Sequence, residues 1–78
     1  MKIELRLEQW PDNETLPIIF FPDEITHNKR IECYTERDGH GESERAYMRR
    51  CKKPSTPHEM AQCWEMLRRY TAHAIATI

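Results

Sequence analysis

Glycine is scarce in this chain, and its scarcity excludes several kinds of site. The only two glycines, Gly39 and Gly41, lie in the segment Asp38-Gly-His-Gly. Phosphate-binding loops need more glycines, because the backbone must approach the phosphates closely, and the Gly-x-Ser-x-Gly motif of hydrolases is absent. A core built from 78 residues is also too small to enclose a substrate pocket easily. We therefore expect a protein that is not an enzyme and needs no cofactor.

Long apolar runs are also lacking, and the cysteines cannot all pair. The longest apolar run covers residues 18–21, far too few to cross a bilayer. Charges alternate with apolar residues over residues 2–8, which excludes the apolar stretch of a signal peptide. The three cysteines are an odd number, so a complete disulfide framework is impossible. We expect a single cytoplasmic domain over residues 1–78 that has no membrane partner.

Cysteine and histidine spacing raises the question of a metal site. Cys51 and His58 repeat the spacing of Cys33 and His40, but no closely spaced pair such as Cys-x₂-Cys exists. Cys33 and Cys63 fall on predicted apolar faces, where free cysteine acts as a small hydrophobic residue. We therefore expect reduced cysteines and no metal, and a zinc site that includes Cys51 and His58 is the alternative. The full set of candidate ligands is Cys33, His40, Cys51, His58, Cys63 and His73.

Alternating segments predict a sheet over the first two thirds of the chain. Residues 2–8 and 29–37 alternate apolar and polar side chains, which is typical of half-buried strands. Residues 16–21 are apolar but contain Pro17, which favours a short strand at the sheet margin. The glycine-containing loop at 38–41 predicts a hairpin, with residues 43–52 as the return strand.

A capping pattern predicts a helix over residues 57–76. Thr56 suits the N-cap, Pro57 the first helical position, and Glu59 the third position of a capping box. The expected buried stripe is Met60, Cys63, Trp64, Leu67, Thr71, Ala74 and Ile78. The expected fold is α+β: a small three- to four-stranded, mostly antiparallel sheet packed against one C-terminal amphipathic helix.

Basic residues concentrate in the segment 45–53 and suggest an interaction surface. Residues 1–28 hold two bases against six acids, whereas residues 29–53 hold eight bases against five acids. On a strand, Arg45, Tyr47 and Arg49 would share one face, and Tyr34 would join it from the preceding strand. Cations beside an aromatic ring suit an acidic protein, or phosphate with base stacking. The predicted partner-binding residues are Tyr34, Arg45, Tyr47, Arg49, Arg50, Lys52 and Lys53.

The size of the chain, its segment Tyr-Met-Arg-Arg-Cys-Lys-Lys-Pro at 47–54 and its capped C-terminal helix together give a family resemblance. The chain resembles the short accessory proteins encoded in early regions of lambda-like bacteriophages and prophages. The resemblance implies regulation by binding a host protein and carries over no functional residue. We expect a protein-binding regulator, with a homodimer as a further expectation. The alternative is a nucleic-acid binder using residues 45–53, against which the net charge of −1 argues.

Overall fold

Four antiparallel strands form a sheet in which the chain order is also the spatial order. The computed structural model describes the backbone of residues 2–77 and the side chains of residues 2–71. The strands are β1 (Glu4–Gln9), β2 (Thr15–Ile25), β3 (Ile31–Thr35) and β4 (Gly39–Ser43). A hairpin is present, as predicted, but its turn covers residues 36–38, so Gly39 and Gly41 of the predicted loop at 38–41 belong to β4, which Gly39 opens with a φ of 70°.

Strand β2 lies between β1 and β3, so the prediction of a short marginal strand was wrong. It runs for 11 residues and is buried on both faces, which explains its continuous apolar sequence. The two prolines of β2 are tolerated because neither occupies a position that pairs regularly with both neighbouring strands. Pro17 has a partner only in β1, and Pro22 lies where the register with β3 shifts.

The predicted return strand at residues 43–52 is also wrong. Ser43 ends β4, and a short helix, α1 (Arg45–Arg50), follows. Ala, Met and Arg favour helix, and Tyr47 and Cys51, four residues apart, both join the core cluster beneath α1. Arg49 and Arg50 in the last turn suit the negative end of the helix dipole. A helix of six residues has little stability of its own, so its packing against the sheet must sustain it.

Helix α2 (Pro57–Thr77) begins with the predicted capping box. The Glu59 backbone N–H donates to Thr56 Oγ1, and the Thr56 N–H donates to Glu59 Oε1, each at 3.1 Å. These reciprocal bonds satisfy backbone donors that the first helical turn leaves free. Glu65 and Arg69, one turn apart on this helix, form an ion pair, with Arg69 Nε 3.6 Å from Glu65 Oε1.

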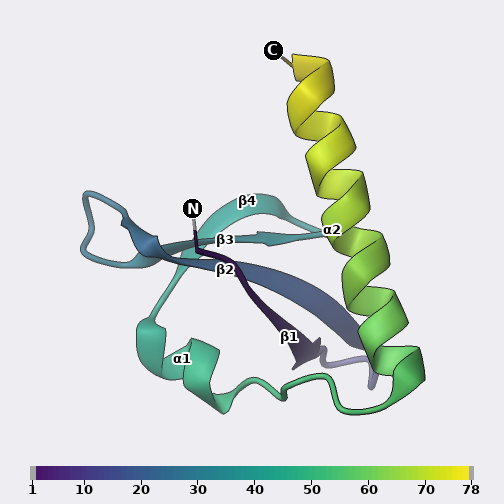
Figure 1. The fold of residues 1–78 in the computed structure, drawn as a ribbon. Coiled ribbons are helices and arrows are strands. Elements are labelled where there is room, and N and C mark those ends of the chain that lie inside the picture. The colour runs from purple at the N-terminus through teal and green to yellow at the C-terminus, as the bar shows by residue number, and fades with distance from the viewer. Residues whose placement is uncertain (1, 78) are drawn as a thin grey trace.

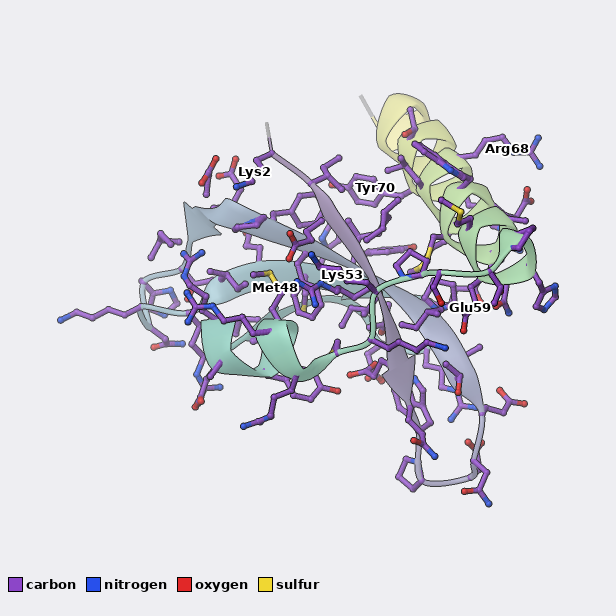
Figure 2. All side chains as sticks on the ribbon, turned by 60° about the horizontal axis from the view of Figure 1, so that its bottom comes forward. Lys2, Met48, Lys53, Glu59, Arg68 and Tyr70 are labelled. Atoms are coloured by element: carbon purple, nitrogen blue, oxygen red, sulfur yellow. The ribbon has the colours of Figure 1, made fainter. Side chains whose placement is uncertain are left out.

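The buried stripe of α2 differs from the predicted one. Met66 and Cys63 are each only 1% exposed, whereas Met60 and Trp64 are 48% and 61% exposed. The true stripe is Cys63, Met66, Leu67 and Tyr70. Figure 2 shows Tyr70 directed toward the sheet and Arg68 pointing away from it. The predicted stripe residues Ala74 and Ile78 lie outside the described side chains.

The two helices cover opposite faces of the sheet (Figure 1). Successive residues of β2 alternate between two core clusters: Ile18 and Phe20 lie on the α1 face, and Ile19 and Phe21 on the α2 face. Arg6 is one of the polar residues in the alternating segment 2–8, yet it is only 8% exposed, and its guanidinium donates to the Cys51 carbonyl at 2.9 Å. The observed fold is the predicted α+β sheet with a C-terminal helix, to which α1 adds a cover on the second face.

Candidate functional site

The predicted cation–aromatic surface does not form, because its two tyrosines lie on opposite sides of the sheet. Tyr34 is on the α2 face, with its ring centroid 5.0 Å from that of Tyr70 and 5.1 Å from that of His40. Tyr47 is on the α1 face, where its ring packs edge-on to Phe20 at 6.5 Å. The error came from treating residues 43–52 as a strand, which would have placed both rings on one outer face.

The cations of the basic segment are placed individually rather than as one patch. Arg45 donates from its guanidinium to the Pro22 carbonyl at 2.8 Å, and Lys52 Nζ lies 2.6 Å from Glu59 Oε2. Arg50 lies over the Tyr47 ring, with its guanidinium carbon 5.9 Å from the ring centroid. Arg49 and Lys53 are exposed, and neither forms an ion pair among the described residues. The segment therefore presents fewer free charges than its sequence suggests.

The candidate metal ligands do not gather into one site among the described side chains. Across residues 2–71, whose side chains are described, no group of three or more His, Cys, Asp and Glu is arranged to hold a metal ion. The candidate ligand His73 lies outside those side chains. All three cysteines are buried and free, and burial raises the pKa of Cys51 and Cys63 and that of Cys33 to about 11. A protonated thiol is a poor ligand and a poor nucleophile.

Two large apolar side chains expected in the core are instead exposed on the outer flank of α2. Met60 and Trp64 are one helical turn apart, and Arg68 follows one turn later, with 76% of its side chain exposed. We call Met60, Trp64 and Arg68 the outer row of α2. Sequence reasoning missed it because Trp64 neighbours the buried Cys63, and a helical wheel alone does not settle which of them faces the sheet.

A cavity of about 230 Å³ lies beneath α1. It is lined by residues of β1, β3 and β4 and by Tyr47. Tyr47 is the one predicted site residue that contributes to it. Glu8, a polar residue of the alternating segment 2–8, and Trp10, which lies just after β1, also line it. A tryptophan beside a Pro-Asp-Asn turn was the available signal, since a large ring there needs somewhere to pack.

Comparison with family models, curated proteins and solved structures finds no match to this chain. Within residues 2–77, neither helix is long and apolar enough to cross a membrane. Any functional conclusion therefore depends on the surfaces and the cavity described above.

Proposed function

We propose that this chain is a non-catalytic regulatory protein that acts by binding another protein through the outer row of α2. The observation that carries this proposal is the Trp64 side chain, which is 61% exposed on the helix that covers the sheet. Exposed tryptophan is costly to keep in water and is enriched among the residues that dominate protein interfaces. In keeping with the resemblance to phage accessory proteins, we expect a host protein as the partner.

The chemistry of the row indicates what the partner must present. Met60 and Trp64 are suited to an apolar groove, into which residues at four-residue spacing on one helix insert together. Arg68 extends the row with a cation, and Arg69, 60% exposed at its side chain, lies next to it. Glu65 pairs with both arginines and Arg69 also pairs with Glu36, so the charges of this cluster balance, although the Arg68 side chain is 76% exposed. The expected partner surface is therefore an apolar groove with polar groups at the end that meets the exposed Arg68.

The test compares two exposed hydrophobic residues. Nuclease-treated bacterial lysate is passed over the immobilised chain, and the captured protein is then purified and titrated against each variant. Trp64→Ala should weaken binding by about 2 kcal/mol or more, which is about 30-fold in Kd. Ile25→Ala, which alters a 58% exposed side chain at the far end of β2, should bind like wild type.

Two outcomes would contradict this assignment of the surface. Unchanged binding by Trp64→Ala would exclude the outer row. If wild type instead self-associates with rising concentration in sedimentation experiments and Trp64→Ala does not, the partner is a second copy of the chain.

Nucleic-acid binding is the second candidate, and the exposed Arg49, Arg50 and Lys53 favour it. Neutralising three phosphates gives a log–log slope of affinity against salt of about −3. Replacing these residues with alanine should abolish random-DNA binding if this candidate is right. If the wild-type chain binds no DNA at low salt, nucleic-acid binding is excluded.

A further inference from the structure

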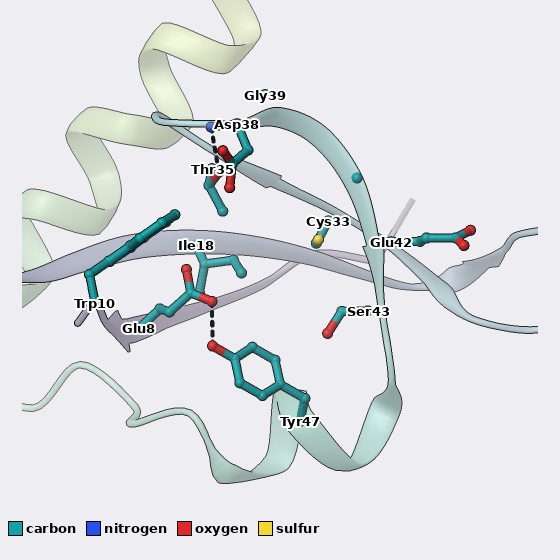
Figure 3. A pocket seen from close by; sticks show the side chains of 11 residues that line it. Glu8, Trp10, Ile18, Cys33, Thr35, Asp38, Gly39, Glu42, Ser43 and Tyr47 are labelled. Atoms are coloured by element: carbon teal, nitrogen blue, oxygen red, sulfur yellow. Dashed lines mark hydrogen bonds between the residues drawn. The ribbon is translucent and has the colours of Figure 1, made fainter.

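The cavity beneath α1 is lined by side chains from distant parts of the sequence (Figure 3). The Ile18 side chain and the Tyr47 ring supply apolar wall, and Trp10 enters from the turn after β1. Asp38 and Ser43 lie at its margin, from the loop before β4 and the end of that strand. The volume of about 230 Å³ is below the range of roughly 300–1,000 Å³ typical of drug-sized ligands. The cavity therefore suits a small ligand.

Two residues that line this cavity each have a buried polar atom with no hydrogen-bond partner among the described residues. These atoms are Glu8 Oε1, an acceptor, and Trp10 Nε1, which can only donate. The other Glu8 oxygen, Oε2, accepts a hydrogen bond from the Tyr47 hydroxyl (Figure 3). Buried polar atoms are nearly always paired, because leaving one unpaired costs free energy. An unpaired acceptor and an unpaired donor on two residues that line one cavity thus point to a ligand with both kinds of group.

The charges around the cavity favour a cation. Glu8, Asp38 and Glu42 line it, and none of them takes part in an ion pair among the described residues. Glu42 instead accepts from Asn28 at 2.7 Å, and Figure 3 shows its side chain turned away from the cavity. The pKa of the Cys33 thiol is raised to about 11, first by burial and then by the charges of Glu8 and Asp38.

Two arginines close to residues of the cavity are already engaged. The Arg37 guanidinium carbon lies 4.5 Å from the Trp10 ring centroid, but Arg37 pairs with Asp12 and Glu14. Arg6 pairs with Glu4 and donates to the Cys51 carbonyl. Neither of them forms an ion pair with Glu8, nor does Arg50, which lies over the Tyr47 ring, so a positively charged ligand would find a carboxylate with no paired cation among the described residues.

We propose that this cavity binds a small amino alcohol, whose ammonium group donates to Glu8 Oε1 and whose neighbouring hydroxyl oxygen accepts from Trp10 Nε1. A simple amine would leave the indole N–H unpaired, and a diol would leave the carboxylate without a countercharge. The methylene groups of the ligand would contact Ile18 and the Tyr47 ring. Free amino alcohols and 2-amino sugars both carry this β-hydroxyammonium group. The site is on the α1 face and does not depend on the proposed role of α2.

The test uses three probes of similar size on wild-type protein labelled with ¹⁵N: ethanolamine, propylamine and ethylene glycol. The chain has two tryptophans, so the indole N–H signal of Trp64 is an internal control for that of Trp10. Ethanolamine should shift the Trp10 signal saturably and leave the Trp64 signal in place. Propylamine and ethylene glycol should each bind on the order of 10-fold more weakly, since each lacks one of the two polar interactions.

Glucosamine in a fourth titration distinguishes the two sources of the β-hydroxyammonium group. Binding at least as tight as that of ethanolamine indicates an amino sugar, and weaker binding indicates a free amino alcohol.

Variants test the two named atoms. Glu8→Gln should weaken ethanolamine binding on the order of 10-fold, because the amide lacks the charge, and Trp10→Phe should weaken it severalfold in calorimetry. Asp23→Asn removes the same charge from an exposed position outside the cavity and should bind normally.

The proposal is overturned if no probe gives a saturable shift of the wild-type Trp10 signal, which would mean that the cavity holds only water. It is also overturned if ethylene glycol binds as tightly as ethanolamine. Both results come from the wild-type chain and stand even if a variant does not fold.

Discussion

Two methionines on α2 have opposite environments, although they are only six residues apart in the sequence. Met66 is 1% exposed and packs with Ile19 and Phe21 on the α2 face, whereas Met60 is 48% exposed. We expect Met66→Ala to cost about 2–5 kcal/mol in the free energy of unfolding, because it leaves a cavity in the core. Met60→Ala should change that free energy by no more than about 0.5 kcal/mol. Urea unfolding followed by circular dichroism measures both.

The total stability of so small a core, about 3–5 kcal/mol, makes a milder variant necessary. Met66→Leu keeps the volume and should cost less than about 1.5 kcal/mol, so it should remain folded and measurable. If Met60→Ala were as destabilising as Met66→Ala, the orientation of α2 described above would be wrong, and the outer row would lose its basis.

At the scale of the element, the start of α2 depends on the ionised form of Glu59. The Lys52 ammonium, followed by the backbone N–H groups of Ser55 and Thr56, lowers the pKa of Glu59 from 4.5 to about 2. The unfolded chain therefore takes up this proton at a higher pH than the folded chain. The stabilisation is complete above about pH 4.5 and is lost as the pH falls toward about 2.

We therefore expect Glu59→Gln to reduce the loss of stability between pH 4.5 and 2, relative to wild type. Urea midpoints measured across this range give the two slopes. Glu32→Gln, at an exposed carboxylate with no hydrogen bond among the described residues, is the matched control and should follow wild type. Parallel pH profiles for wild type and Glu59→Gln would show that the capping box contributes nothing through its charge.

The elements also show what the sequence could and could not predict. The capping box, the hairpin and the strand β1 were predictable, because each depends on side chains and backbone preferences that lie close together in the chain. Helix α1 was not, because its six residues fit a two-residue period as well as a helical one and are held by contacts with β2 and β3. Pro17 made β2 look marginal, and only its pairing partners show why a central strand tolerates it.

The same reasoning explains the outcome for the predicted sites. A strand at 43–52 would have gathered Arg45, Tyr47 and Arg49 on one face. Because residues 45–50 follow a helical period instead of a two-residue period, these side chains do not share the predicted face. The cavity depends on Glu8, Trp10 and Tyr47, which are up to 39 residues apart and meet only when α1 folds back over β1. No local pattern contains that information.

At the scale of the whole molecule, β2 contributes residues to the hydrophobic cores on both faces of the sheet. Ile18 and Phe20 belong to the core under α1, and Ile19 and Phe21 to the core under α2. A rearrangement that pulls β2 out of one core must remove it from the other as well, because adjacent residues of one strand cannot move independently. Helices α1 and α2 should therefore detach from the sheet in a single unfolding transition rather than one after the other.

The cysteines report on this coupling, since they are buried and lie on both sides of the sheet. Cys33 and Cys51 are each 8% exposed in the α1 core, and Cys63 is 1% exposed on α2. We expect iodoacetamide to label all three with the same urea midpoint, once each rate is divided by the rate of that thiol in the fully unfolded chain. That normalisation removes the differences in thiol pKa that burial produces. Digestion and mass spectrometry quantify each site. Because Cys51 directly follows the short helix α1, its labelling at lower urea than Cys63 would mean that α1 detaches alone, and that the cavity beneath it opens without unfolding the sheet.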